Sequence, residues 1–256
     1  MDRDHLSHFE IIKKGHTATI YRDGDRTLKF YPNAPPGETE HEAKLQRFAA
    51  DAGLPVPAVY GVRTWDDGAS AIEMDYVDGQ QLLRPGMCVK YHNHAIAELV
   101  NLQVRVHNVD GTGLPSQTDW LRQQVERHLG GAGHVPTREY LLTRIGKLDT
   151  GHTALCHGDF HPFNVLFNGE RYRIIDWDNA AAGDPLADAC QTYLVINEFF
   201  GQSAEVYLRL FCRETGARPE DVLAWHPVVA ASNLVGQDEK GRAYLMEIIE
   251  EQSCKS

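Results

Sequence analysis

The sequence predicts an α+β protein in which a strand-rich N-terminal region precedes a mainly helical remainder. Short strand-like runs fill residues 9–31, and the turn Asp23-Gly24-Asp25 between two of them is typical of a hairpin. A single stretch of good helix formers, 38–52, comes next, and two further strand-like runs follow it. Most of the chain beyond residue 78 has the spacing of apolar residues that indicates helices.

The N-terminal region divides into elements at clear turn and stop signals. We expect strands over 9–13, 19–22, 27–31, 56–62 and 69–77, with the helix at 38–52 between the third and fourth. Gly53 and Pro55 end this helix. Gly79 gives the backbone freedom near the end of the region, so we predict two domains, residues 1–77 and 78–256.

The second region is expected to be helical apart from three short strands. The helices are predicted at 89–107, 119–129, 137–148, 185–200, 204–215 and 219–251. Asp184 as N-cap and Pro185 at the first position start the apolar helix 185–200. The strands are predicted at 153–156, 165–167 and 172–175.

The segment between the first two of these strands carries the most informative residues. It reads His-Gly-Asp-Phe-His-Pro-Phe-Asn, with Asp159 and, five positions later, Asn164, and Asp176 follows at the end of the third strand. One carboxylate, Asp159, can accept a proton from an attacking hydroxyl, while Asn164 and Asp176 offer the oxygen ligands that Mg²⁺ prefers. A loop and a hairpin can bring the three together, so the pattern favours phosphoryl transfer.

This segment resembles the catalytic segment of the aminoglycoside phosphotransferase and choline kinase-like family. That family has a His-Gly-Asp, an Asn five residues after the Asp, and an Ile-Asp-Trp or Ile-Asp-Phe, and each is present here. The order of elements in residues 9–77 also matches the nucleotide-binding lobe of the kinase-like fold. The resemblance implies a bilobal protein-kinase-like fold, with a small antiparallel β lobe that carries one helix and a larger, mainly helical lobe.

The same resemblance implies an ATP-dependent phosphotransferase that moves the γ-phosphate to a hydroxyl of a small molecule. Asp159 is then the catalytic base, Asn164 and Asp176 are the metal ligands, and the cofactors are ATP or GTP and Mg²⁺. His157 is expected to support the loop through its ring. The acidic residues of the stretch 183–188 are expected to cap the helix and brace the loop. For Asp178 a substrate contact, a metal contact and a solvated position all stay open.

Lys29 lies in the middle of a predicted strand, where it can neutralise phosphate charge. By the family pattern its partner is Glu42 in the following helix, with Glu38 and Glu40 as rivals because the helix register is not fixed by the sequence. A solvated strand lysine is the alternative reading of Lys29 taken alone.

Two backbone segments complete the predicted nucleotide site. The loop that contains Gly15, His16 and Thr17 can direct its amide groups at phosphates, although it has only one glycine. The segment that ends in Asp75, Tyr76 and Val77 resembles the inter-lobe hinge, whose backbone would bind the adenine edge.

The phosphate acceptor is left open by the sequence. An aminoglycoside-like or amino-alcohol acceptor is compatible with four acidic residues of the helical region, which are equally compatible with exposed helix surfaces: Asp119, Glu126, Glu198 and Glu205. A nucleotide-binding regulatory pseudokinase remains the alternative, although such proteins commonly lose one of the key residues. A protein kinase is disfavoured, because an Ala-Pro-Glu segment and a long activation loop do not follow Asp176.

Composition narrows the cellular setting. The chain has 256 residues, of which 42% are hydrophobic, a formal net charge of −11 and five scattered cysteines. An acidic chain is a poor nucleic-acid binder, and the cysteine spacing indicates neither a disulfide framework nor a zinc site. No apolar run is long enough to span a membrane, and the charged N-terminus leads into no signal region. We therefore expect a cytoplasmic monomer or weak homodimer that binds a small molecule.

Overall fold

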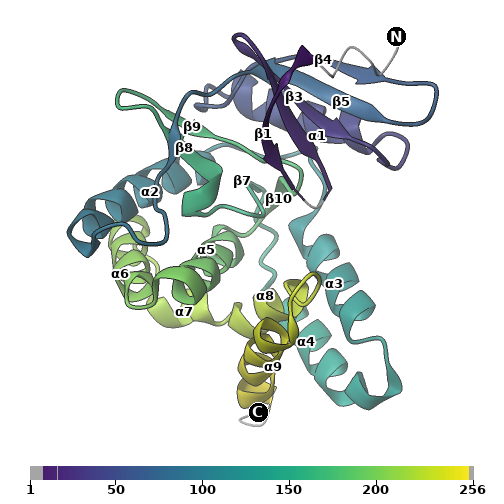
Figure 1. Cartoon of the computed structure of the whole chain (residues 1–256). Helices are drawn as coiled ribbons and strands as arrows, with labels where there is room; N and C mark the ends of the chain where they lie inside the picture. Colours follow the sequence, from purple (N-terminus) through teal and green to yellow (C-terminus); the bar gives the residue numbers. More distant parts are fainter. Residues whose placement is uncertain (1–7, 16, 254–256) are drawn as a thin grey trace. The chain divides into compact units, whose positions relative to one another are not determined.

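The computed structural model describes residues 8–15 and 17–253, which form two compact units (Figure 1). Unit 1 takes the described residues up to Leu82 together with Asn164–Asn179. Unit 2 takes Leu83–Phe163 and the described residues from Ala180 onward. The predicted domain limits, 1–77 and 78–256, are a single cut in the chain, whereas unit 1 also includes a later segment. That segment belongs to unit 1 because its strand β8 pairs with β6.

Unit 1 contains two antiparallel sheets and one α-helix. Its elements are β1 (Glu10–Lys14), β2 (Thr19–Asp23), β3 (Arg26–Tyr31), α1 (Glu38–Asp51), β4 (Val59–Thr64), β5 (Ser70–Asp75), β6 (Gln80–Gln81), β8 (Val165–Phe167) and β9 (Tyr172–Ile174). The larger sheet has the order β1-β2-β3-β5-β4, and the smaller one has the order β6-β8-β9. Helix α1 packs against β4 and β5 of the larger sheet (Figure 1). The predicted strand 56–62 begins later than expected, because Pro57 cannot donate to a strand ladder.

The alternation of side chains along β3 directs one set of residues at α1 and another at the opposite face of the sheet. Leu28 and Phe30 pack with Ala69 and Ala71 in one apolar cluster. Tyr31 packs against a second cluster, formed by Ala43 of α1 with Ile72 and Met74 of β5. Because successive strand residues point to opposite faces, Lys29 shares the α1 side of the sheet with Tyr31.

Unit 2 is mainly helical, as the sequence predicts. Its elements are η2 (Val89–Tyr91), α2 (His92–His107), α3 (Gln117–His128), η3 (Ala132–His134), α4 (Val135–Leu148), β7 (Ala154–Cys156), β10 (Ala181–Gly183), α5 (Pro185–Phe200), α6 (Ser203–Thr215), α7 (Pro219–Leu223), α8 (His226–Ser232) and α9 (Glu239–Ser253), while η4 (Pro162–Asn164) runs into unit 1. Helix α5 packs against α6 and α8, and α2 packs against α6. Strand β10, which the sequence analysis did not predict, pairs antiparallel with β7.

The predicted helical stretch 219–251 is broken into α7, α8 and α9. Pro227 lies at the first turn of α8, where a proline is tolerated but cannot continue a preceding helix. Gly236 has a φ of 76°, a left-handed conformation that interrupts helical backbone before α9. The apolar spacing of this stretch therefore predicted its helical character but not its breaks.

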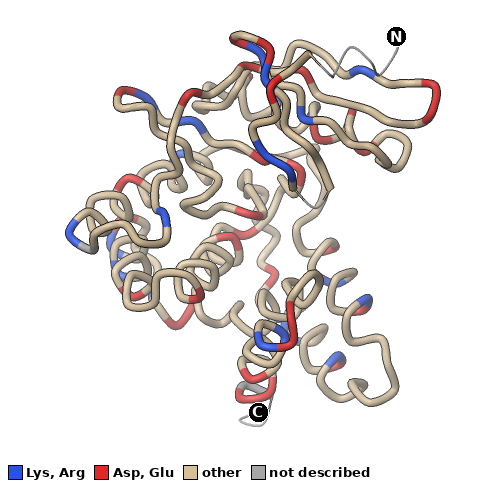
Figure 2. The backbone as a smooth tube through the Cα atoms, viewed as in Figure 1, with Lys and Arg blue, Asp and Glu red and all other residues tan. Residues whose placement is uncertain are grey.

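Acidic and basic residues are interspersed along the backbone of both units (Figure 2). Within residues 8–15 and 17–253, none of the helices combines the length and apolar character needed to cross a bilayer.

Candidate active site

Lys29 of β3 is held between two carboxylates within unit 1. Its Nζ lies 2.7 Å from Oε1 of Glu42 on α1, and it also donates to Oδ1 of Asp176. Glu38 and Glu40, the rival partners, are exposed in the first turn of α1, whereas Glu42 is buried against the sheet. The ammonium group therefore lies where it can face an anion without losing its helix partner.

Tyr31 adds a third member to this cluster. It lies two residues after Lys29 on the same face of β3, and its hydroxyl donates to Oε2 of Glu42. Both carboxylate oxygens of Glu42 therefore accept a hydrogen bond, one from each side chain. Tyr31 was not among the predicted site residues, although its spacing of two residues from Lys29 on one strand was a usable signal.

The protonation states in this cluster are set by burial and by neighbouring charges. Burial of Lys29 lowers the pKa of its ammonium group, but the carboxylates of Asp176 and Glu42 outweigh that effect, so the pKa is raised well above its ordinary value. Burial and the neighbouring Glu42 raise the pKa of the Tyr31 phenol against the opposing effect of Lys29. Near neutral pH Lys29 is thus a cation and the Tyr31 hydroxyl is neutral.

Asp176 has a strained backbone. Its φ is 69°, and among the described residues it is the single non-glycine residue in the left-handed region. The next side chain, Trp177, is fully buried and donates its ring N–H to the Ile174 carbonyl at 3.1 Å, which fixes the chain on both sides of Asp176. Such strain clusters at functional sites, because the surrounding packing must maintain it.

Asn164 and Asp176 are tied to each other through the backbone of unit 1. The carbonyl of Asn164 accepts a hydrogen bond from the N–H of Ile175 at 2.9 Å, so Asn164 lies beside the residue that precedes Asp176. The amide oxygen of Asn164 and the carboxylate of Asp176 are hard oxygen donors, which suit Mg²⁺. Groups of three or more His, Cys, Asp or Glu that could form a protein-only metal cage do not occur among the described residues. A two-ligand site completed by water and phosphate oxygens is the ordinary arrangement for Mg²⁺.

Asp159 lies in unit 2, on the loop between β7 and η4. Its backbone N–H donates to Nδ1 of His157 at 3.3 Å, and its Oδ2 lies 3.2 Å from Nε2 of His161. His157 is fully buried and packs edge-on against Phe160. The ring of His157 therefore supports the loop from inside, as the family resemblance implies.

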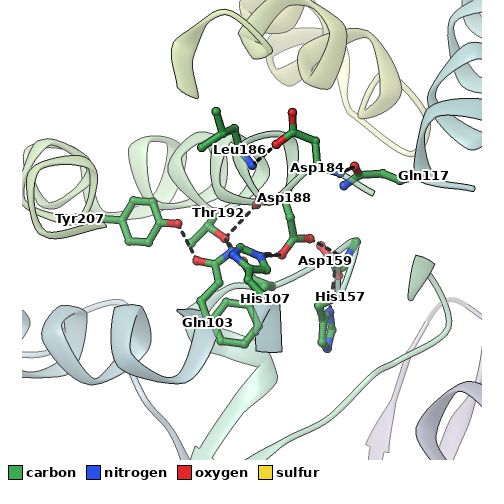
Figure 3. Close-up of polar contacts among 12 residues, drawn as sticks. Gln103, His107, Gln117, His157, Asp159, Asp184, Leu186, Asp188, Thr192 and Tyr207 are labelled. Carbon is green, nitrogen blue, oxygen red and sulfur yellow. Dashed lines mark hydrogen bonds and ion pairs between the residues drawn. The ribbon is translucent and has the colours of Figure 1, made fainter. Parts of the chain in front are cut away.

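The loop is braced by Asp188 of α5, whose carboxylate points toward the residues of the loop (Figure 3). One oxygen of Asp188 accepts from the Gly158 N–H at 2.7 Å, and the other accepts from His107 at 2.8 Å and from Gln103 at 3.1 Å. Burial tends to raise the pKa of Asp188, but the hydrogen bond and charge of His107 outweigh it, so the pKa lies below its ordinary value. Asp188 is therefore a buried anion that fixes the peptide next to Asp159.

A second brace acts on the other side of Asp159. Thr192, one turn after Asp188, donates its hydroxyl to the Phe160 carbonyl at 2.6 Å, and Gln103 donates to the Thr192 hydroxyl at 2.9 Å (Figure 3). Tyr207 of α6 donates to the Gln103 amide oxygen at 2.5 Å. This network was not predicted from the sequence, although Gln103 and His107 lie four residues apart on α2, next to the apolar residues Leu102 and Val106.

Asp184 plays the part expected of it at the start of α5. Its side chain accepts from the Leu186 N–H at 2.8 Å, and its own N–H donates to Gln117 at 2.8 Å. Burial raises the pKa of this carboxyl group. Asp184 caps the helix, whereas Asp188 contacts the loop.

A comparison of Asp188→Asn with Asp184→Asn separates these two roles. Asp188→Asn should lower the free energy of unfolding by about 2–4 kcal/mol, because the amide turns an N–H₂ group toward donors in a buried site. Asp184→Asn should change it by less than about 0.5 kcal/mol, since asparagine is an equally good N-cap. The pKa of Asp188 is lowered, so its contribution is complete above about pH 4 and is lost as the pH falls through the folded-state pKa. Urea unfolding at several pH values measures both effects, and equal losses in the two variants would contradict this assignment.

Gly158 provides the turn that presents Asp159. Its φ is 80°, which alanine adopts only at a cost of about 1–2 kcal/mol. We expect Gly158→Ala to lose that stability and also most phosphoryl transfer. Gly151→Ala is the matched control, because Gly151 has a φ of 74° in the exposed stretch before β7. Thermal unfolding and turnover of the two variants should show similar destabilisation but a loss of turnover only for Gly158→Ala.

The remaining predicted nucleotide contacts lie in unit 1. The Gly15 N–H donates to the Ala18 carbonyl at 2.8 Å in a tight turn, Thr17 is exposed, and His16 lies outside the described residues. The N–H groups of Asp75 and Tyr76 donate to the carbonyls of Ala58 and Asp25. The N–H groups of two of the three hinge residues are therefore used within unit 1. A contact between the Val77 N–H and adenine stays a prediction.

The other acidic candidates lie on a loop of unit 1 and on helices of unit 2. Asp178 is exposed and accepts from Asn179 at 3.0 Å. Asp119 and Glu126 are exposed on α3, Glu198 is exposed on α5, and Glu205 of α6 accepts from the Tyr193 hydroxyl at 2.9 Å. The last four residues thus come from three different helices, α3, α5 and α6.

The chain belongs to the phosphotransferase enzyme family, whose sequence model matches residues 8–225. The match covers parts of both units. It confirms the family resemblance that was based on the residues of segment 157–178. The chain is thus a phosphotransferase-family protein, of the class that includes the aminoglycoside phosphotransferases.

Solved structures with the same fold include aminoglycoside phosphotransferases. A thermostable mutant of APH(4)-Ia, in a ternary complex with ADP and hygromycin B, superposes with a TM-score of 0.75 at 16% identity, over 99% of this chain and 97% of that one. The GDP complex of aminoglycoside 2'-phosphotransferase-IIIa gives a TM-score of 0.67 at 18% identity, over 99% and 96% of the two chains. The predicted kinase-like fold is confirmed.

Curated relatives are longer proteins. The mouse (Mus musculus) acyl-CoA dehydrogenase family member 10 is 26% identical over 219 residues, which are 71% of this chain and 20% of the relative. The human (Homo sapiens) acyl-CoA dehydrogenase family member 11 is 26% identical over 225 residues, or 72% of this chain and 29% of the relative. The chain spans less than a third of the length of these relatives.

Proposed function

We propose that this phosphotransferase transfers the γ-phosphoryl group of ATP or GTP to a hydroxyl group of a small molecule. The observation that carries the proposal is the cluster in which Lys29 is held between Glu42 and Asp176. A buried lysine that pairs with a helix carboxylate, Glu42, and lies beside a proposed metal ligand, Asp176, is suited to bind the phosphates of a nucleotide. The solved neighbours bound to ADP or GDP support a nucleotide as the donor.

In the proposed reaction, residues of unit 1 bind the donor. Lys29 neutralises phosphate charge, and Asn164 and Asp176 would hold Mg²⁺, which supplies further charge stabilisation to the phosphates when bound. The loop that contains Gly15, His16 and Thr17, together with the hinge segment 75–77, would contact the nucleotide through the backbone. Unit 1, which includes residues 164–179, is thus the proposed nucleotide-binding part. Unit 2, which contains Asp159, is the proposed catalytic and acceptor-binding part, so the predicted limits 1–77 and 78–256 leave the later segment on the wrong side.

Asp159 is the proposed base. It orients the acceptor hydroxyl and takes its proton while the new oxygen–phosphorus bond forms and the bond from the γ-phosphorus to the leaving nucleoside diphosphate breaks. Asn164 comes five positions after Asp159, so the chain itself keeps their Cα atoms within about 18 Å. The braces at Gly158 and Phe160 hold the peptides on both sides of Asp159, which favours a fixed position for its carboxylate.

The proposed function is tested by a screen of candidate phosphate acceptors. Hygromycin B is bound by one solved neighbour, which supports aminoglycosides and amino alcohols. The curated relatives are named acyl-CoA dehydrogenase family members, so acyl-CoA thioesters are added to the screen. Because a phosphate acceptor needs a hydroxyl group, thioesters that carry one are used. The protein is incubated with Mg²⁺, ATP or GTP and each acceptor, and product mass is recorded. A gain of one phosphoryl group that requires Asp159 supports the proposal, whereas nucleotide binding without transfer to any of these classes would favour a pseudokinase.

A further inference from the structure

We infer that Tyr31 is a positioning residue for the phosphate-binding cation, Lys29. The inference rests on the proposed function, since it concerns how Lys29 meets a phosphate chain. The two side chains lie on one face of β3, two residues apart, and both donate to the same carboxylate, Glu42. Tyr31 thereby occupies the Glu42 oxygen that Lys29 does not use.

The consequence for Lys29 is geometric. If Oε2 of Glu42 had no fixed partner, the carboxylate would be able to rotate and draw the ammonium toward α1 with either oxygen. The Tyr31 hydroxyl fixes the plane of the carboxylate, so Lys29 is bound through Oε1 alone and keeps its other N–H groups for a second anion. In this structure the second anion is Asp176.

A phosphate chain competes with Asp176 for the ammonium group of Lys29. For Lys29 to exchange Asp176 for a phosphate as its ion-pair partner, its contact with Glu42 must stay in place while its contact with Asp176 breaks. Tyr31 supports that exchange because its hydroxyl donates to Oε2 of Glu42, the oxygen that does not accept from Lys29. The phenol is neutral and remains a donor near neutral pH, since burial and Glu42 raise its pKa.

Tyr31→Phe isolates this role because it removes only the hydroxyl. The ring, whose centroid lies 5.6 Å from Nζ of Lys29, stays in place against the apolar cluster of α1 and β5. Tyr21→Phe is the matched control, since Tyr21 lies on β2 and packs edge-on against Phe30 on the other face of the sheet. Both substitutions remove one hydroxyl group from a tyrosine on a strand of the larger sheet and keep the aromatic ring.

Nucleotide titration of the full chain gives the first readout. In Tyr31→Phe the affinity for magnesium ATP should fall roughly tenfold, while the affinity for adenosine, which lacks phosphates, should change by less than about twofold. A general loss of structure would weaken both ligands equally. Tyr21→Phe should bind both like the wild type. Equal affinities for magnesium ATP in Tyr31→Phe and wild type would overturn the inference.

Chemical labelling of Lys29 gives a second readout that does not depend on nucleotide. An amine-reactive ester is added to the ligand-free protein, and the modified peptide is quantified by mass spectrometry. Because the freed Glu42 carboxylate can hold the ammonium with either oxygen, the labelling rate of Lys29 should fall severalfold in Tyr31→Phe and stay unchanged in Tyr21→Phe. If the wild type fails to bind nucleotide, the proposed function fails while the labelling still tests Tyr31. Unchanged labelling of Lys29 in Tyr31→Phe contradicts the positioning role.

Discussion

Replacing Asp159 with asparagine is expected to lower kcat about 10²- to 10⁴-fold, which is the usual contribution of a general base. The amide keeps the shape of the carboxylate but cannot take the proton of the acceptor hydroxyl. Affinity for magnesium nucleotide should stay within about twofold of the wild type, because Asp159 is assigned to the acceptor and not to the donor. Steady-state turnover and nucleotide titration together give this pattern.

The control for this variant is Asp149→Asn. Asp149 is an exposed carboxylate at the end of α4 that accepts from the Gly151 N–H at 3.0 Å. Its replacement removes the same charge from the same unit and should leave kcat unchanged. Wild-type turnover in Asp159→Asn on an identified acceptor would show that the base is elsewhere.

Asp176→Asn should be at least as damaging, with a loss of turnover of about 10³-fold or more. The change removes the charged oxygen ligand and also the strongest charge that keeps Lys29 in its present position. Asparagine is the suitable replacement, because it tolerates the left-handed backbone at a φ of 69° better than alanine does. The loss can therefore be assigned to the carboxylate and not to backbone strain.

Magnesium dependence distinguishes this effect from a general loss of activity. Nucleotide affinity of the wild type should rise when Mg²⁺ is added, and in Asp176→Asn that rise should largely disappear. Asp178→Asn provides the comparison two residues later, on an exposed side chain that contacts Asn179. A magnesium response that is kept in Asp176→Asn and lost in Asp178→Asn would reverse the assignment of the two carboxylates.

The hairpin that carries Asn164 and Asp176 at its ends was predictable because its strands and turn are close in sequence. Asp159, Asn164 and Asp176 lie on a loop and a hairpin whose strands are marked by apolar runs and by the Asn168-Gly169 turn. The hydrogen bond from the Ile175 N–H to the Asn164 carbonyl follows from the register of that hairpin. The left-handed backbone of Asp176 was not predictable, because aspartate rarely adopts it without packing such as that of Trp177.

The helix register that selects Glu42 could not be predicted from the apolar residues. The buried face of α1 includes the polar residues Thr39, Glu42 and Gln46, which blur the apolar periodicity from which register is inferred. Each has a specific partner: Thr39 meets Ser70 at 2.6 Å and Gln46 donates to the Pro57 carbonyl at 2.7 Å. These partners are distant in sequence, so only the folded sheet reveals why polar residues are buried there.

The network beneath the loop was missed for a related reason. Gln103, His107, Thr192 and Tyr207 come from three helices, and their hydrogen bonds converge on the loop only when α2, α5 and α6 are packed together. The sequence placed Asp188 near the loop through the family resemblance, but it gave no sign of the partners that keep this carboxylate ionised.

Calorimetric titration of ATP into the full chain, with and without Mg²⁺, tests the central claim most directly. We predict binding of about one nucleotide per chain that is strengthened by Mg²⁺ in the wild type and loses that response in Asp176→Asn. Nucleotide affinity that is indifferent to both the metal and this carboxylate, or the absence of any binding by the wild type, would contradict the account.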